Sequence, residues 1–313
     1  MENLRVNYLI VLALLLLSAV IHSAPGATLT VGQGAGFDYS NIQDAIDAAE
    51  DGDIVLIGRD HYYEHLKLSG KTITLASNYI NTKDEQEIIE TIIDGSNTGV
   101  GLNISDVGSE TTVAGLTIRD CGDGIYVSSK FSLLNCRIVD CADGIDYEGG
   151  GGLCRDSFFY NNSDDAIDLD QDTEVVIRNN LIIDSGDDGI EIRLHLYAGP
   201  VLTSVIAGNI ILGSEEDGIQ LVDYPDNSDR VFYIENNVIA RTNMAAIGCM
   251  GNGNSDENYE AADLPEKVYV RNNTFVDNNF GITGGDNMVV TNNLFARTTE
   301  TALKEVDGQS QVD

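Results

Sequence analysis

Positively charged side chains are scarce in this sequence. Its 313 residues include 17 Lys and Arg against 51 Asp and Glu, which gives a formal net charge of -34. Nucleic-acid binding needs a basic footprint, so this class of function is excluded. A surface this acidic also repels polyanions unless cations bridge the two, and it suits a salty habitat or a protein loaded with cations.

A long apolar run occurs only once, at Tyr8–Val20. Arg5 precedes the run and several small residues follow it, which is the order of a secretory signal peptide. The run is shorter than the roughly 20 residues that a membrane-spanning helix needs. We predict a signal peptide over residues 1–27, cleaved after Ala24 or Ala27, and a soluble exported chain with no membrane contact in its mature form. An uncleaved anchor is the alternative.

Metal motifs built from closely spaced cysteines or histidines are missing. The five cysteines are Cys121, Cys136, Cys141, Cys154 and Cys249, and none forms a Cys-x-x-Cys pair. An odd number in an exported chain leaves at least one thiol unpaired within the chain. Cys121 and Cys141 occupy the same position in a repeat, so they either form a disulfide or lie as stacked free thiols.

Helical periodicity is absent after residue 50, whereas a different repeat is present. A motif of Asp, then Gly or Ala, then Ile recurs at Asp123, Asp143, Asp165, Asp188 and Asp217. By subtraction, its isoleucines at Ile125, Ile145, Ile167 and Ile190 are 20, 22 and 23 residues apart, and later copies are farther apart. Repeats of this kind indicate a solenoid.

A second repeated element, Asn-Asn followed by apolar residues, falls between the copies of the first, for example at Asn179 and Asn236. Asn tolerates left-handed turn backbone and bonds neighbouring amides. Short strands alternating with such turns predict an all-β, right-handed parallel β-helix. Its coils of about 20 to 36 residues would stack at the inter-strand spacing of about 4.8 Å.

The segment Val31–Ser77 contains IQDAIDAA, DGDIVLIG, YYEH and KTITLAS, and TIIDG follows at Thr91. It resembles the opening of pectin-lyase-like β-helix proteins. The resemblance implies that SNIQDAIDAAE forms a short N-terminal capping helix, with Ser40 or Asn41 as its N-cap. That superfamily includes lyases, hydrolases, epimerases, esterases and surface proteins, so the fold alone does not give the activity.

The β-helix domain is predicted to span residues 28–313. The chain stops in a coil at Thr301–Val306, followed by the polar sequence DGQSQVD, with no recognisable C-terminal cap. Because solenoids need capped ends, we expect either a domain truncated at this end or cover from another domain. The protein is therefore expected to be a monomer or part of a larger multidomain chain.

The sequence DGIEIRLHLY concentrates functional groups on one predicted strand. Side chains alternate across a strand, so the apolar side chains face the core, namely Ile190, Ile192, Leu194 and Leu196. Glu191, Arg193, His195 and Tyr197 would then lie together on the outward face. Residues at the first outward position of successive coils read Tyr126, Asp146, Asp168, Glu191 and Gln220. At the second outward position they read Glu148, Asp170 and Arg193.

Stacked carboxylates about one coil apart repel each other, and a hard cation such as Ca²⁺ relieves this repulsion. We therefore predict a Ca²⁺ site formed by Asp146, Asp168, Asp170 and Glu191. The alternative is that Arg193 forms lateral ion pairs on an acidic face. The turn carboxylates that precede the strands are expected to cap their own turns.

Arg193 among these carboxylates resembles the site of pectate-lyase-like proteins, in which a cation acidifies a proton beside a uronate carboxylate and a basic residue removes it. The resemblance implies that Arg193 pairs with charge or abstracts the proton. His195 is the second candidate base, since the ordinary pKa of an imidazole is about 6.5. Tyr197 and Gln220 are predicted to bind substrate.

Three functions remain open. The leading prediction is a Ca²⁺-dependent lyase of acidic polysaccharide. A non-catalytic, carbohydrate-binding or structural surface solenoid is the main alternative. A glycoside hydrolase similar to polygalacturonases is the third, because Asp187 and Asp188 could supply the two carboxylates that such chemistry requires.

Overall fold

The computed structural model describes residues 26–224, 228–255, 259, 262 and 264–313. The predicted signal peptide, apart from its last two residues, and the apolar run Tyr8–Val20 lie outside the described residues. Among the helices that are described, none is long and apolar enough to cross a membrane.

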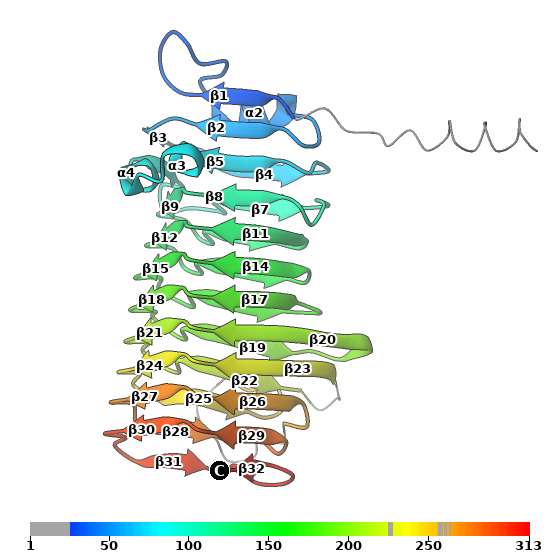
Figure 1. The fold of residues 1–313 in the computed structure, drawn as a ribbon, viewed down its shortest axis with the longest axis vertical. Coiled ribbons are helices and arrows are strands. Elements are labelled where there is room, and N and C mark those ends of the chain that lie inside the picture. The colour runs from blue at the N-terminus through cyan, green and yellow to red at the C-terminus, as the bar shows by residue number, and fades with distance from the viewer. Residues whose placement is uncertain (1–25, 225–227, 256–258, 260–261, 263) are drawn as a thin grey trace, which may run out of the picture.

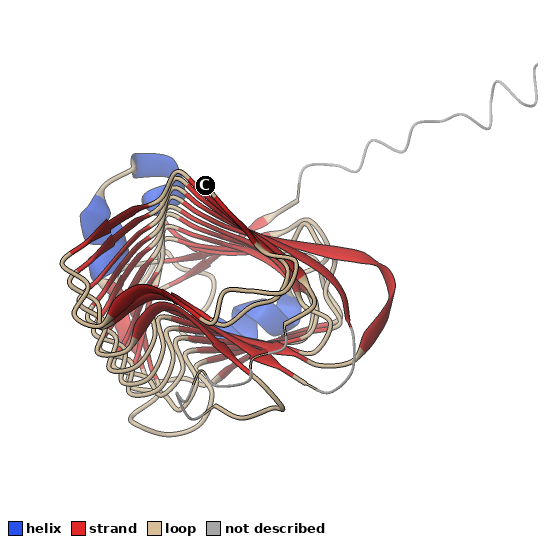
Figure 2. Cartoon of the chain, turned by 90° about the horizontal axis from the view of Figure 1, so that it is seen from below, coloured by secondary structure: helices blue, strands red, loops and turns tan. Residues whose placement is uncertain are grey.

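The described chain forms three parallel sheets that wind together into one solenoid, with coils stacked along the long axis (Figure 1). Each full coil contributes one strand to sheet 1, then one to sheet 2, then one to sheet 3. All pairings between coils are parallel. The view along the axis shows the strands of successive coils superposed around a common interior (Figure 2). The predicted all-β right-handed parallel β-helix is confirmed.

The strands of each sheet are given in chain order. Sheet 1 contains β1 (Thr28–Val31), β2 (Ile54–Ile57), β5 (Thr74–Ser77), β8 (Thr112–Ala114), β11 (Lys130–Leu134), β14 (Gly151–Arg155), β17 (Glu174–Arg178), β20 (Tyr197–Ala207), β23 (Ser228–Glu235), β26 (Lys267–Arg271), β29 (Met288–Thr291) and β32 (Gln311–Val312). Sheet 2 contains β3 (Asp60–Tyr62), β6 (Thr91–Asp94), β9 (Thr117–Arg119), β12 (Arg137–Val139), β15 (Phe158–Tyr160), β18 (Leu181–Ile183), β21 (Ile210–Leu212), β24 (Val238–Ala240), β27 (Thr274–Val276) and β30 (Leu294–Ala296). Sheet 3 contains β4 (Leu66–Ser69), β7 (Leu102–Ser105), β10 (Ile125–Val127), β13 (Ile145–Glu148), β16 (Ile167–Asp170), β19 (Ile190–Leu194), β22 (Ile219–Asp223), β25 (Ala245–Met250), β28 (Phe280–Thr283) and β31 (Thr301–Lys304).

The isoleucines of the first repeat form a continuous apolar ladder inside sheet 3. Each is fully buried: Ile125, Ile145, Ile167, Ile190, Ile219, Ile247 and Ile282. Burying such a side chain contributes about 1.5–3 kcal/mol. The ladder therefore fixes which face of sheet 3 points inward and which face points away from the core.

The Asn-Asn element forms the turn between sheets 1 and 2. The first Asn of each pair has a left-handed backbone, for example Asn179 with φ 56°, and Gly208 replaces it with φ 70° in a variant copy. The second Asn is buried. Asn209 donates to the Ile177 carbonyl at 3.0 Å and accepts the backbone N–H of Asn180 at 2.9 Å. The same bonds repeat at the corresponding Asn of the next coils, so the predicted Asn turn is confirmed.

Helix α2 (Ile42–Ala48) packs its apolar face on the first coil, at the N-terminal end of the core. It is shorter than the segment predicted to form it. Asn41 occupies the N-cap position but makes no side-chain capping bond. Instead, the Glu64 carboxylate accepts the backbone N–H groups of Ile42 at 2.9 Å and Gln43 at 3.0 Å, so the cap comes from the following coil.

Two further helices, α3 (Tyr79–Thr82) and α4 (Glu85–Ile89), lie beside the N-terminal end of sheet 2 (Figure 1). The sequence did not predict these two helices. These helices are too short to show apolar periodicity. Arg59 holds α4 in place through Glu87 and Glu90, at 2.9 and 3.0 Å.

All five cysteines are buried free thiols, so Cys121 and Cys141 take the stacked-thiol alternative. The last coil continues through β31 into β32, which lies within the polar C-terminal sequence.

Candidate functional site

Sheet 3 aligns the predicted outward residues as the repeat requires. Tyr126 pairs with Asp146, Asp146 with Asp168, Asp168 with Glu191, and Glu191 with Gln220. The predicted column along the outer face is therefore confirmed. Most of its members are not freely exposed, however: Asp168 is 9% exposed and Glu191 only 3%.

A group of three buried carboxylates forms around this column. One carboxylate oxygen from each of Asp165, Asp168 and Glu191 lies within 4.8 Å of the other two. Asp165 belongs to the turn that enters β16, Asp168 lies on β16, and Glu191 lies on β19. Two of the four predicted Ca²⁺ ligands are therefore brought together with a turn carboxylate that was not predicted to be a ligand.

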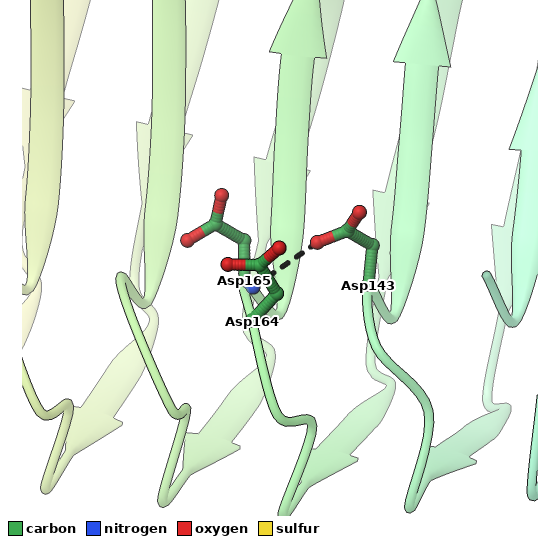
Figure 3. A group of neighbouring side chains, drawn as sticks. All are labelled: Asp143, Asp164 and Asp165. Atoms are coloured by element: carbon green, nitrogen blue, oxygen red, sulfur yellow. Dashed lines mark hydrogen bonds between the residues drawn. The ribbon is translucent and has the colours of Figure 1, made fainter. Parts of the chain in front are cut away.

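Two similar groups lie along the turns between sheets 2 and 3. Asp143, Asp164 and Asp165 form the first, and Figure 3 shows Asp143 reaching from one coil toward the two aspartates of the next. Asp187, Asp188 and Glu216 form the second. Asp165 is shared by the turn group of Figure 3 and the group on sheet 3, so it links the two groups.

The buried turn aspartates also bind backbone groups of the adjacent coil. Asp143 accepts the N–H of Asp165 at 3.1 Å, Asp165 accepts that of Asp188 at 2.8 Å, and Asp188 accepts that of Asp217 at 2.7 Å. Asp217 continues the series by accepting the N–H of Ala245 at 2.6 Å. The expectation that these carboxylates cap their own turns is wrong for this series, because each accepts a backbone N–H group of the next coil.

Burial raises the pKa of these carboxyl groups. For Asp168, burial and the charges of Glu191 and Asp170 raise the pKa to about 9, against the opposing effect of Arg193. Burial and the neighbouring charge of Asp123 raise the pKa of Asp146 to about 7. Without a cation, these groups therefore retain protons at pH values where ordinary carboxyl groups are charged.

The described residues leave specific carboxylate oxygens without a partner. Oδ1 of Asp146 and Oδ1 of Asp168 are buried and accept no hydrogen bond from any described group. Unsatisfied buried oxygens of this kind are costly. Ca²⁺ binds oxygens at about 2.3–2.6 Å, so ligand oxygens on one ion are at most about 5 Å apart. The donor type and spacing of Asp165, Asp168 and Glu191 fit such an ion.

Arg193 lies at the edge of the carboxylate group. Its Nε is 2.6 Å from Glu191 Oε2 and 3.9 Å from Asp170 Oδ1. Burial disfavours its charged form, but the hydrogen bond to Glu191 and the charges of Asp168 and Asp170 outweigh this effect and raise the pKa of Arg193. The side chain is thereby held as a cation, which favours charge pairing over proton abstraction.

His195 lies next to Arg193 and faces the same carboxylate. Its Nε2 is 3.5 Å from Asp170 Oδ1, and its ring stacks on Tyr224 with centroids 4.4 Å apart. These two contacts orient the imidazole at the margin of the buried carboxylates. Its side chain is 32% exposed, so a substrate can reach it.

The predicted strand is too long, because β19 ends at Leu194, and the predicted alternation is wrong at Leu196 and Tyr197. Leu196, predicted to face the core, is 66% exposed. Tyr197 begins β20 in sheet 1, and its hydroxyl donates to the Pro200 carbonyl at 3.1 Å. Gln220 is 1% exposed and lies under Ser255, whose carbonyl is 3.5 Å from its Nε2. The structure thus buries Gln220 beside Glu191 and places Tyr197 at the start of a strand of another sheet.

Comparison with known sequences agrees with the fold. The family described as the right-handed β-helix region matches residues 31–195 and, in a second overlapping match, residues 135–295. The chain belongs to the right-handed β-helix family. No curated protein matches the sequence of this β-helix protein.

Several solved structures share the fold. Pectate lyase Pel9A superimposes with a TM-score of 0.67 at 13% identity, over 93% of this chain and 79% of the lyase. An alginate lyase from Paenibacillus sp. str. FPU-7 gives 0.56 at 14% identity, over 91% of this chain and 99% of that one. The GH136 lacto-N-biosidase from Eubacterium ramulus superimposes with a TM-score of 0.55 at 11% identity, over 92% of this chain and 67% of the biosidase. At these identities the likeness concerns the fold alone.

Sequence reasoning missed two residues of the site in this β-helix protein. Asp165 belongs to the repeated motif, and its recurrence one coil from Asp143 and Asp188 was the available signal for clustering. Tyr224, which orients His195, lies after β22, one coil away in the fold. No pattern in the sequence pairs it with His195.

Proposed function

We propose that this protein is an exported, Ca²⁺-dependent lyase of acidic polysaccharide. One observation carries the proposal: a group of carboxylates spaced to hold a cation lies on the outer face of sheet 3 beside a paired guanidinium and a partly exposed imidazole. The structural neighbours include a pectate lyase and an alginate lyase, which makes a uronate polymer the first substrate to test.

Asp165, Asp168 and Glu191 would hold the ion, with Asp146 and Asp170 beside them. When bound, Ca²⁺ would draw electron density from the uronate carboxylate and so acidify the adjacent C–H group. A bound cation also offsets the repulsion between the acidic surface and a polyanion.

The protein's own groups then complete an elimination. Arg193 pairs with the uronate carboxylate and orients the sugar. His195 accepts the proton from the carbon beside that carboxylate. The electron pair of the broken C–H bond forms a carbon–carbon double bond, and the glycosidic C–O bond breaks. The departing oxygen takes a proton from water, which leaves an unsaturated uronate at the new chain end.

The test measures the ultraviolet absorbance of that unsaturated product. The purified protein is incubated with pectate and with alginate, in Ca²⁺ and in chelator. We expect a Ca²⁺-dependent rise that falls about 100- to 10,000-fold in His195→Ala, the range that a general base contributes. Arg193→Ala should also lose activity, and Arg193→Lys should retain part of it.

Other outcomes assign other functions. Cleavage that yields no absorbance and persists in chelator would favour the hydrolase. Glycan binding without any cleavage would favour the non-catalytic solenoid.

Ca²⁺ binding has its own readout in titration calorimetry. Asp168→Asn removes one ligand charge and should weaken Ca²⁺ affinity by about tenfold or more, because ligand charge tunes affinity over orders of magnitude. Asp106→Asn is the matched control, since Asp106 is exposed and lies away from the carboxylate groups. Equal affinities in the two variants would contradict the proposed ion site.

A further inference from the structure

The outer face of sheet 2 is apolar over its last six strands, from β15 to β30. The strand register aligns two outward side chains from each strand in two columns along the solenoid axis. All except Thr274 are aliphatic or aromatic, and none is charged: Phe158, Tyr160, Leu181, Ile183, Ile210, Leu212, Val238, Ala240, Thr274, Val276, Leu294 and Ala296. These residues are called the apolar face below.

Solvent reaches the apolar face in the described chain. Tyr160 is 41% exposed, Ile210 is 42% exposed and Leu294 is 58% exposed. The side chains that alternate with them point inward and fill the core, as Ile211 does at 0% exposure. Contiguous apolar patches of several hundred Å² on a protein surface often mark interaction sites.

The chain itself covers the part of sheet 2 that precedes this face (Figure 1). Thr117 on β9 is 5% exposed, and its hydroxyl donates to the Ile88 carbonyl of α4 at 2.8 Å. The cover ends at Ile89, which is 43% exposed. A cavity of about 360 Å³ follows, lined by α4 and by Phe158 and Leu181 of the apolar face. The apolar face is therefore continuous with a surface on which this protein already packs an element.

Charge makes this face the favoured contact between two copies of the chain. A formal net charge of -34 causes two copies to repel each other over most of their surface. The apolar face has no charged side chain, and along one side it borders the uncharged Asn turn, for example at Asn236 and Asn272. Two copies that meet here leave the carboxylates of sheet 3 outside the contact.

The shape of the face also fits a second copy. Each copy carries rows of side chains at the same spacing of about 4.8 Å, so the rows of one copy fit between those of the other along the whole face. Six strands, each about five residues wide with its flanking turn residues, cover about 460 Å². Two such faces bury about 900 Å² in total, which is at the low end for protein interfaces and predicts a weak dimer.

We propose that the apolar face of sheet 2 is a self-association surface, through which two copies of this chain form a weak symmetric dimer. Helices α3 and α4 stand on the same side of the solenoid, near its N-terminal end (Figure 1). Copies that ran in the same direction would bring these helices together before the faces met. The two copies therefore run in opposite directions, with the two-fold axis between β21 and β24, the middle strands of the face.

Sedimentation velocity of the purified protein, in chelator and over a range of concentrations, tests for the dimer. We expect a monomer–dimer equilibrium with a Kd in the micromolar range or weaker. The Kd should fall at least about tenfold from about 0.1 M to about 1 M NaCl, because the screening length falls from about 10 Å to about 3 Å and the repulsion weakens. A monomer at every protein and salt concentration would overturn the proposal.

A pair of charge variants locates the contact. Ile210→Asp places an unpaired carboxylate from each copy in the middle of the interface, so dimerisation should weaken at least about tenfold. Val201→Asp is the matched control, because Val201 is 56% exposed on β20 in sheet 1 and should leave the Kd unchanged. Circular dichroism establishes that both variants are folded. A dimer that responds equally to the two substitutions lies on another surface and contradicts the proposal.

Cysteine substitutions test the direction of the two copies. All five natural cysteines are buried, so an added surface thiol reacts alone. In copies that run in opposite directions, the two Ile210→Cys thiols are one coil apart along the axis, at about 4.8 Å, and the two Leu294→Cys thiols are five coils apart, at about 24 Å. A short bis-maleimide should join Ile210→Cys copies and leave Leu294→Cys copies separate. Joining of the Leu294→Cys copies would overturn the opposed arrangement.

Reaction with a monofunctional maleimide distinguishes a different occupant of the face. In dilute monomer, the Ile210→Cys thiol should react as fast as a Val201→Cys thiol, and at high concentration and high salt only the former should become protected. Protection of Ile210→Cys in the monomer would mean that another part of the chain covers the face, and this result would contradict self-association.

Discussion

Asp168 shows how far the behaviour of one carboxyl group depends on its position in the stack. An exposed aspartate has a pKa of about 3.9. Asp168 is buried between Asp146 and Glu191, and its pKa is raised to about 9. Alternation and repeat spacing were enough to predict this column from the sequence. The depth of burial was not predictable, because it depends on cover from other coils.

The raised pKa predicts how stability depends on pH in cation-free solution. The folded state binds the Asp168 proton more tightly than the unfolded state does. Protonated Asp168 therefore makes its full contribution to the free energy of unfolding below about pH 4, and this contribution is lost as the pH rises toward about 9. We expect the thermal midpoint in chelator to fall across this window and Ca²⁺ to restore it. Scanning calorimetry at a series of pH values measures this.

Asp168→Asn distinguishes the effect of Asp168 on the pH dependence of stability from the effect of the other acidic side chains. In chelator, the thermal midpoint of this variant should fall less steeply with rising pH than that of the parent protein. The midpoint of Asp106→Asn should fall as steeply as that of the parent. Identical slopes in all three proteins would show that Asp168 is not the titrating group.

At the scale of elements, the turns as well as the short strands link successive coils. Asn side chains link successive coils at one corner and Asp side chains do so at another. The Asn turn was predictable because the pair Asn-Asn recurs in the sequence, and Asn tolerates the left-handed backbone that such a turn needs. The inter-coil bonding of Asp165 was not, because a turn aspartate can equally bond within its own turn.

Asn209→Ala tests the Asn turn. The change leaves the Ile177 carbonyl and the N–H of Asn180 buried without their partner, and each such loss costs about 1–3 kcal/mol. We expect the free energy of unfolding to fall by about 2–4 kcal/mol, measured by denaturant titration.

Asn179→Gly is the matched control at the same corner. Asn179 is exposed and has a φ of 56°, which glycine adopts without strain. The free energy of unfolding of the Asn179→Gly variant should differ from that of the parent protein by no more than about 0.5 kcal/mol. A loss in Asn179→Gly as large as that in Asn209→Ala would contradict a specific role for the buried ladder.

The short elements outside the repeat show where sequence reasoning stopped. Helix α4 has five residues and depends on Arg59, which lies on an earlier coil. The break after Leu194 moved Tyr197 into another sheet. Both features depend on contacts between coils rather than on local pattern, whereas the repeats themselves were sufficient to predict the solenoid.

At the scale of the whole molecule, charge is the dominant property. A formal net charge of -34 on one elongated body favours expansion by self-repulsion. Between about 0.01 M and 1 M salt the screening length falls from about 30 Å to about 3 Å. We expect the chelated protein to unfold at a higher temperature as NaCl increases over this range, measured by circular dichroism. A flat or falling midpoint would mean that ion pairs, such as those of Arg59, outweigh the repulsion.

The Asn turn has a consequence for how such a chain can change its length. From Asn180 onward, each buried Asn donates its amide N–H to a carbonyl of the coil before it and accepts a backbone N–H of that same earlier coil. The junctions between these coils therefore present the same donors and acceptors. Deleting or duplicating one complete coil would bring two equivalent faces together and leave these bonds satisfied. Gain or loss of one whole coil in this part of the chain would therefore change the length of the solenoid without leaving a turn unbonded.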